Sequence, residues 1–214
     1  PKATPAVWLG PGHVQEFVKG NPNCMVIDSA EPAVKKELAA ALSGKLIRMY
    51  YGDDLIGNEV GAAAKNVIGI AAGMLDGIGG DSMKGALMAR GAREVSRLIK
   101  AMGGNEMTAY GLCHLGDYEA TLFSPHSHNR SFGEAFARAQ AQGSGTELDM
   151  LRKGRHNIGL AEGVNTAQAI MLLSCEYNVD MPICSGVYSV IFHGVEVGEA
   201  LEGMLLRNLK TEFY

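Results

Sequence analysis

Short apolar runs alternate with short amphipathic ones over the first fifty residues of the chain. β-Branched and aromatic residues predict three strands, and apolar residues at helical spacing predict two helices between them; in chain order these elements are 6–9, 14–18, 24–27, 31–42 and 46–51. Pro32 stands where a helix tolerates proline, in its first turn. The order β, α, β, α, β is typical of a layered α/β structure. Three short strands make a marginal sheet, so we expect the chain to begin inside a domain.

The pattern changes after Asp54, where apolar residues recur every three or four positions almost to the end of the chain. Glycines such as Gly103-Gly104 mark the ends of several segments. The expected helices are 54–78, 82–102, 105–112, 131–142, 146–153, 161–177, 183–192 and 197–206, with loops around 113–130. We therefore expect a mainly α chain in which 54–214 forms a helical domain and 1–53 belongs to an α/β domain.

Composition and charge narrow the class of protein. The 214 residues are 47% hydrophobic and 20% charged, which suits a folded globular protein. A net charge of −4 argues against a nucleic-acid partner. The most apolar long stretch, 67–75, is too short to cross a membrane, and the opening PKATPAVWLGPG has no signal-peptide features. We expect a cytoplasmic protein.

The cysteines and histidines predict no metal site. Cys24, Cys113, Cys175 and Cys184 form no CxxC motif and lie in or beside apolar runs, so buried free thiols are expected. His126 and His128 are separated by one residue and lack a third ligand at a plausible spacing.

One lysine stands in a stripe of glycines on the predicted helix 54–78. Positions 57, 61, 65, 69 and 73 lie on nearly the same face, and all but Lys65 are glycine. Each glycine weakens a helix, so the stripe calls for the close approach of another backbone or of a ligand. The apolar neighbours of Lys65 would make its proton easier to remove, as a general acid or base requires. Alternatively, the glycines serve helix packing and Lys65 reaches the solvent.

A second group of polar residues lies at 111–130. Ser127, Asn129 and Arg130 stand at a predicted helix start, where free backbone N–H groups and the helix dipole favour an anion. Ordinary capping of the helix by Ser127 or Asn129 explains the same residues equally well. Neither Gly10-Pro-Gly12 nor Gly77-Ile-Gly79-Gly80 fits the GxGxxG fingerprint of dinucleotide-binding folds.

Taken together, several motifs resemble the bacterial glycerol-3-phosphate dehydrogenases, specifically their later part. The motifs are GNEVGAAAKNVIGIAAG at 57–73, ARGARE at 89–94, HLGD at 114–117, SHNRSFG at 127–133 and AEGV at 161–164. The resemblance implies a helical domain of the 6-phosphogluconate-dehydrogenase-like type at 54–214, preceded by the closing strands of a Rossmann-like α/β domain. On this reading the dinucleotide-binding part with GxGxxG is missing, and 1–53 is a remnant of it.

The resemblance also implies a reaction and a set of site residues. Hydride would pass reversibly between NAD or NADP and glycerol 3-phosphate or dihydroxyacetone phosphate, supplying glycerol 3-phosphate for phospholipid synthesis, with Lys65 as the proton-transfer residue. Substrate-binding positions would be Gly10, Gly12, Asn66, Asp117, Thr121, Ser127, His128, Asn129 and Arg130. Cofactor-binding positions would be Val14, His128, Leu160 and Glu162.

Two departures from the family pattern affect the substrate site. Where the family has Ser-Arg-Asn, this chain has Ser127-His128-Asn129, and Arg130 is expected to compensate for the lost guanidinium. Gly12-His13 replaces a Ser or Thr followed by an aromatic residue. The alternatives are a non-catalytic, self-associating helical unit and a related two-domain hydroxy-acid dehydrogenase. The preference between NAD and NADP stays open, as does a homodimer.

Overall fold

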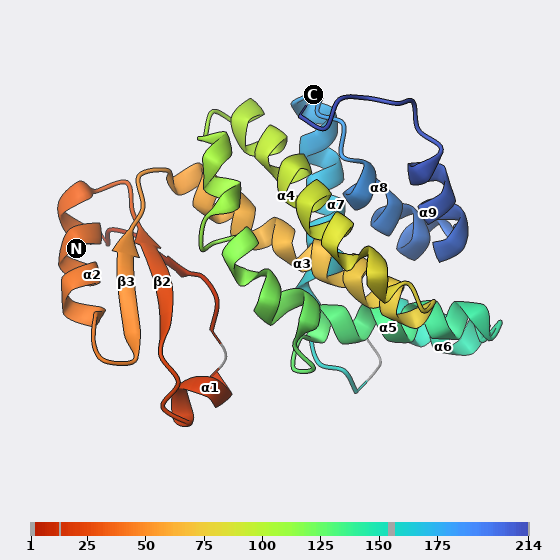
Figure 1. Ribbon diagram of the computed structural model, residues 1–214, viewed down its shortest axis with the longest axis horizontal. Coiled ribbons are helices and arrows are strands. Elements are labelled where there is room, and N and C mark those ends of the chain that lie inside the picture. The colour runs from red at the N-terminus through yellow and green to blue at the C-terminus, as the bar shows by residue number, and fades with distance from the viewer. Residues whose placement is uncertain (1–2, 13, 154–156, 214) are drawn as a thin grey trace.

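The computed structural model describes residues 3–12, 14–153 and 157–213, and its N-terminal part is a small sheet with two helices. The strands β1 (Val7–Leu9), β2 (Asn23–Asp28) and β3 (Ile47–Tyr51) lie in that order, with β1 antiparallel to β2 and β2 parallel to β3. The helix α2 (Pro32–Leu42) covers one face, and α1 (Val14–Val18) follows β1 (Figure 1). Ile27, Ala39 and Met49 form the buried core of this part. All three predicted strands and both helices are confirmed.

The remainder of the described chain is helical and is arranged around one long helix, α3 (Leu55–Gly77) (Figure 1). Asp54 caps this helix by accepting a hydrogen bond from the Gly57 backbone N–H. The other α-helices are α4 (Lys84–Ala101), α5 (His128–Ala141), α6 (Gly145–Arg152), α7 (Glu162–Glu176), α8 (Pro182–Tyr188) and α9 (Val197–Leu205). Their shared core includes Ile68, Ile70, Phe132 and Phe136, all fully buried. Within the described residues, no helix is both long and apolar enough to span a membrane.

Short helices replace several of the segments predicted as α-helix or loop. The 3₁₀ helix η2 (Glu106–Tyr110) stands where an α-helix over 105–112 was predicted. The loop predicted at 113–130 contains the 3₁₀ helix η3 (Leu115–Asp117) and the π-helical η4 (Glu119–Phe123). The remaining short helices are η1 (Asp81–Met83), which precedes α4, and the π-helical η5 (Ser189–His193), which follows α8. Helical turns this short do not produce a repeating pattern of apolar residues, so the spacing of apolar residues in the sequence does not reveal them.

The helix α5 begins three residues earlier than predicted. Its first residue is His128 instead of Ser131, because the Ser127 side chain accepts a hydrogen bond from the Arg130 backbone N–H and caps the helix. The earlier start brings 128–130 into the first turn of α5. The earlier start of the helix therefore determines the direction in which each of these three side chains points.

The glycine stripe on α3 serves close packing against α5 and the η-helices. A Cβ atom on Gly73 would collide with the carbonyl oxygen of Arg130 on α5, and one on Gly133 would collide with the carbonyl oxygen of Ile70 on α3. A Cβ on Gly61 would lie 2.9 Å from the Cys113 sulfur. The structure therefore supports close approach of other chain segments as the reason for the glycines.

The cysteines follow the prediction only in part. Cys113 and Cys184 are buried free thiols, whereas Cys24 is half-buried and Cys175 is exposed on α7. Burial raises the pKa of Cys113 to about 12, so this thiol stays protonated and unreactive at neutral pH. The prediction of burial was therefore wrong for Cys175.

Candidate functional site

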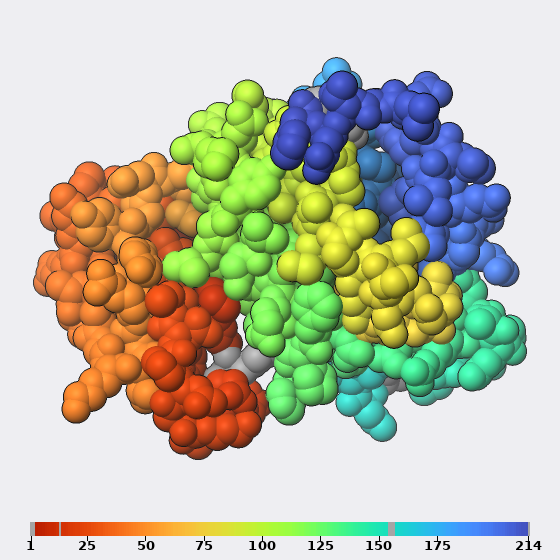
Figure 2. Space-filling model, viewed as in Figure 1, coloured from red at the N-terminus to blue at the C-terminus, as the bar shows by residue number. Residues whose placement is uncertain are grey.

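A polar cavity of about 190 Å³ lies between the N-terminal segment and the helical part of the molecule. The surface is hollowed where the red N-terminal segment meets the green segment that precedes α5 (Figure 2). The lining residues come from five separate stretches of chain: Gly10, Gly12, Lys65, Asn66, Asp117, Ala120, Thr121, His126, Ser127, His128, Asn129 and Glu162. Eight of the nine predicted substrate positions, together with Lys65 and Glu162, are thus brought to one cavity.

Lys65 projects from α3 into this cavity and forms an ion pair with Asp117 of η3. The Asp117 side chain is only 4% exposed, and that of Lys65 is 20% exposed. The Thr121 hydroxyl lies 3.5 Å from Asp117 Oδ1, at the outer limit of a hydrogen bond. Lys65 therefore neither sits among apolar groups alone nor simply reaches the solvent, and the structure gives it a buried counter-charge that sequence spacing does not reveal.

Asn129 joins the first turn of α5 to α3 and α7 through hydrogen bonds. Its side-chain NH₂ donates to Asn66 Oδ1 at 3.2 Å and to Glu162 Oε2 at 3.4 Å. Its side-chain oxygen accepts from the Gly163 backbone N–H at 2.8 Å. A Cβ on Gly163 would crowd the Asn66 carbonyl, so this glycine lets α7 approach α3. The network fixes an amide and a carboxylate side by side at the cavity.

The N-terminus of α5 forms another wall of the cavity, with Ser127 as its cap and His128 as its first helical residue. His128 lies against Gly159, where a Cβ would come within 2.7 Å of the imidazole. Gly159 also has a φ of +90°, which favours glycine, so the backbone before α7 lies directly against the imidazole. Backbone N–H groups at a helix start and an imidazole beside them suit an anion.

Arg130 lies outside this cavity, contrary to the expectation that it would bind the substrate anion. Its guanidinium Nε donates to Asp76 Oδ2 at 2.6 Å, and Glu134 lies 3.5 Å away on the same helix. Burial acts to raise the pKa of Asp76, but hydrogen bonds from Lys84 and Asp81 and the charge of Arg130 outweigh it and lower that pKa. Arg130 is therefore engaged with Asp76 of α3 and is absent from the residues that line this cavity.

Two predicted cofactor positions lie at the surface, away from the cavity wall. Val14 is 73% exposed on α1, and Leu160 is 68% exposed just before α7. His13, at the departure from the family turn, lies outside the described residues. Conversely, the cavity lining includes His126 and Ala120, which sequence reasoning did not assign to the substrate site. The position of His126 one residue before the Ser127 cap was the available signal.

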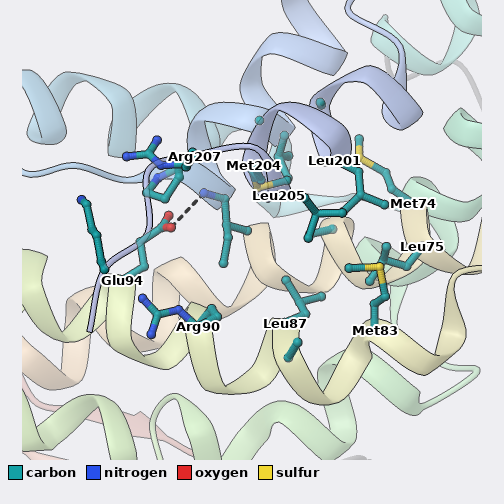
Figure 3. Close-up of a pocket in the computed structure, with 18 of the residues that line it drawn as sticks. Met74, Leu75, Met83, Leu87, Arg90, Glu94, Leu201, Met204, Leu205 and Arg207 are labelled. Carbon is teal, nitrogen blue, oxygen red and sulfur yellow. Dashed lines mark hydrogen bonds between the residues drawn. The ribbon is translucent and has the colours of Figure 1, made fainter. Parts of the chain in front are cut away.

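A second cavity, of about 380 Å³, lies between α3, α4, α8 and α9 and the C-terminal segment (Figure 3). Its walls are mostly apolar side chains, including Met74, Leu87 and Met204. Glu94 at this cavity accepts hydrogen bonds from the Ile183 and Cys184 backbone N–H groups at 2.8 and 2.9 Å and so caps α8. Burial raises the pKa of Glu94. The Glu94 carboxylate is therefore engaged in the fold, and Arg90 and Arg207 are also among the residues that line this cavity.

The fold defines a class: a mainly helical domain that follows the small three-stranded sheet of an α/β unit. Residues 54–202 match the family model described as "NAD-dependent glycerol-3-phosphate dehydrogenase C-terminus". The chain therefore belongs to the NAD-dependent glycerol-3-phosphate dehydrogenase C-terminal family.

Curated relatives with the same family name are longer than this chain. The glycerol-3-phosphate dehydrogenase [NAD(P)+] of Rhodospirillum rubrum is 37% identical over 213 residues, which are 99% of this chain and 59% of that protein. The Clostridium botulinum enzyme of the same name is 38% identical over 97% of this chain and 61% of its own length. The chain thus spans about 60% of the length of these relatives.

Solved structures show the same fold. Glycerol-3-phosphate dehydrogenase from Coxiella burnetii superposes with a TM-score of 0.81 at 29% identity, covering 94% of this chain and 60% of that one. DsGPDH of Dunaliella salina superposes with a TM-score of 0.80 at 20% identity, covering 92% of this chain and 34% of its own. The predicted mainly helical fold and the family resemblance are confirmed.

Proposed function

We propose that this chain supplies the substrate-binding and proton-transferring part of a glycerol-3-phosphate dehydrogenase. The observation that carries the proposal is the Lys65–Asp117 ion pair at a cavity that also holds Thr121, Asn66 and the start of α5. In the reduction of dihydroxyacetone phosphate, the Lys65 ammonium would donate a proton to the C2 oxygen. In the oxidation of glycerol 3-phosphate, the Lys65 amine would take up the C2 hydroxyl proton.

Asp117 and its neighbours orient this proton transfer. The buried carboxylate fixes the direction of the Lys65 ammonium. Thr121 and Asn66 line the same cavity and offer a hydroxyl and an amide to the substrate hydroxyl groups. The reaction then depends on a pre-formed arrangement in which the lysine Nζ faces the reacting oxygen.

The phosphate group of the substrate would bind at the start of α5. Ser127, His128 and Asn129 line the cavity there, and the first-turn N–H groups add hydrogen-bond donors. Gly10 and Gly12 form the opposite wall, where the absence of side chains leaves room for a ligand. Arg130 is left out of this assignment because its guanidinium is bound to Asp76.

The polar groups beside the cavity fit the carboxamide end of a nicotinamide cofactor, NAD or NADP. Glu162 offers carboxylate acceptors, and Asn66 offers an amide, which together complement a primary amide. When bound, the cofactor accepts or donates the hydride. His128 lines the same cavity. Val14 and Leu160 are exposed outside it and would contact the outer parts of the cofactor.

The two parts of the chain would have separate roles. Residues 1–53 would belong to the nucleotide-binding domain and residues 54–214 to the substrate-binding domain. Two distinct cores, one in the sheet and one around α3, support this division. We also propose a cytoplasmic homodimer with no nucleic-acid partner: free thiols suit a reducing compartment, and the exposed Leu205, Leu206 and Leu209 offer an apolar contact surface.

Binding experiments with the chain itself test the substrate class. Calorimetric titration would compare dihydroxyacetone phosphate, glycerol 3-phosphate, glycerol and inorganic phosphate. We expect the two phosphorylated three-carbon compounds to bind and glycerol not to bind. Preference for the unphosphorylated compound would instead favour a related hydroxy-acid dehydrogenase. Absence of all binding would favour a non-catalytic, self-associating helical unit.

Activity of the gene product as its native host makes it tests the role of Lys65. Reduction of dihydroxyacetone phosphate would be followed by loss of NADH or NADPH absorbance. We expect Lys65→Met to lower kcat/KM by about 10²- to 10⁴-fold, the usual contribution of a general acid. Lys100→Met removes an exposed lysine of α4 and serves as the matched control. Equal activities of the two variants would refute the assignment.

A further inference from the structure

A buried histidine and a buried tyrosine lie directly behind the Lys65–Asp117 pair. His114 is fully buried, as is Tyr118, and their rings meet edge-on with centroids 4.8 Å apart. His114 Nδ1 lies 2.8 Å from the Gly61 carbonyl oxygen, and its Nε2 lies 2.6 Å from the Tyr118 hydroxyl. Both ring nitrogens are therefore hydrogen-bonded inside the protein.

The partners determine which atom carries each proton. A backbone carbonyl can only accept, so Nδ1 of His114 carries a proton and donates it to Gly61. Burial lowers the pKa of His114 to about 4, so the ring is neutral at pH 7 and Nε2 is an acceptor. Burial also raises the pKa of Tyr118 well above its usual value, so its hydroxyl keeps the proton that it donates to Nε2. Each donor in this pair thus meets an acceptor.

His114 reaches both members of the Lys65–Asp117 pair through the backbone. The Gly61 carbonyl accepts a hydrogen bond from the His114 imidazole. In α3 the same carbonyl faces the backbone N–H of Lys65, which lies four residues later in the helix. The His114 carbonyl accepts from the Asp117 backbone N–H at 3.0 Å, closing η3. One residue therefore ties the turn of helix that carries the lysine to the turn that carries the carboxylate.

Tyr118 is held in turn by α4. A Cβ on Gly91 would lie 3.0 Å from the Tyr118 hydroxyl oxygen, so that glycine leaves the space the hydroxyl occupies. After burial, the charged forms of Cys184, Glu94 and Tyr110 would act to raise the pKa of Tyr118 further. The hydroxyl is thus enclosed by neighbouring helices and forms a hydrogen bond with His114 Nε2.

We propose that His114 and Tyr118 are positioning residues that set the separation between the Lys65 and Asp117 side chains and thereby the efficiency of proton transfer. The inference rests on the proposed function of Lys65. Neither residue touches the cavity, and they act only through η3 and α3. Removing either hydrogen bond lets η3 shift relative to α3, which misplaces the carboxylate that orients the lysine.

Nuclear magnetic resonance of the chain tests this arrangement independently of activity. Imidazole ¹⁵N shifts should show a protonated Nδ1 and an unprotonated Nε2 on His114. In Tyr118→Phe and His114→Asn, the Asp117 Cγ and Lys65 Cε signals should move from their wild-type positions. Phe136→Leu disturbs the same core away from η3 and serves as the control for general loosening. A proton on Nε2, or unmoved Asp117 and Lys65 signals in both variants, would overturn the proposal.

Kinetics of the gene product provide the second readout. We expect Tyr118→Phe to lower kcat by about 10- to 100-fold while KM changes little, because the cavity that binds substrate keeps its lining. Phe136→Leu should leave kcat unchanged at temperatures where it is folded. Equal losses of kcat in Tyr118→Phe and Phe136→Leu would show a purely structural role and contradict the proposal. An inactive wild-type protein would refute the proposed function, and the resonance data alone would then decide the positioning role.

Discussion

The stability of the protein should fall on mild acidification because of His114. The ordinary pKa of histidine is 6.5, and burial lowers that of His114 to about 4 in the folded protein. Between these pH values the unfolded chain binds a proton that the folded protein excludes. The free energy of unfolding is therefore fully retained above about pH 6.5 and declines as the pH falls towards 4.

The size of the effect follows from the two pKa values. The whole difference corresponds to about 3 kcal/mol in the acid limit. Between pH 7 and pH 5, about 2 kcal/mol of this is lost. Glu94 acts in the opposite sense, because burial raises its pKa in the folded state, so its contribution is present at low pH and is lost as the pH rises. A measurement on the wild type alone would therefore mix two opposing effects.

Urea unfolding of matched variants isolates the histidine. The loss of free energy of unfolding between pH 7 and pH 5 should be about 2 kcal/mol larger in the wild type than in His114→Asn, whose amide does not titrate in this range. His193→Asn removes an exposed imidazole and controls for the loss of a histidine elsewhere. The same pH dependence in the wild type and in His114→Asn would refute the assignment of a buried neutral imidazole.

Two further substitutions test the packing around the cavity. Gly73→Ala should lower the free energy of unfolding by about 1–3 kcal/mol, because the new Cβ meets the Arg130 carbonyl. Gly85→Ala, in open space on α4, is the control and should raise the free energy of unfolding slightly. Urea titration measures both variants, and an unchanged free energy of unfolding in Gly73→Ala would contradict the close approach of α5. Asn129→Ala should lower the free energy of unfolding by about 1–3 kcal/mol, because the Gly163 N–H loses its hydrogen-bond acceptor. Asn165→Ala, on the exposed side of α7, is the control. Equal free energies of unfolding in the two variants would exclude a bridging role for Asn129.

Much of the fold could be predicted because local patterns decide it. The strands at 6–9, 24–27 and 46–51 and the helix at 54–78 have strong apolar patterns and clear turn residues, and they lie within a residue or two of the observed elements. The segment 105–123 has neither a strong apolar pattern nor clear turn residues. Its 3₁₀ and π turns are held by contacts such as the Cys113 sulfur against Gly61, and those form only when α3 is in place.

The site was less predictable because it depends on the rotation of each helix. Arg130 seemed suitable for the anion site since it stands close to Ser127 in sequence. Each helical residue turns about 100°, so a side chain two positions after His128 points elsewhere, and there it meets Asp76, which lies 54 residues earlier in the chain. The ion pair of Lys65 and Asp117 likewise joins residues 52 positions apart. Spacing along the chain carries no information about such partners.

The close approach of α3 and α5 at Gly73 and Gly133 limits the substitutions that this protein can accept. Each glycine faces the backbone of the opposite helix, so a larger residue at one position meets a carbonyl group and not a side chain. A second substitution cannot make room, because there is no side chain to shorten. Compensation would require the two helices to separate, which would pull the first turn of α5 away from Asn66 and Lys65. These two positions should therefore accept no alternative residue in a descendant that keeps the cavity.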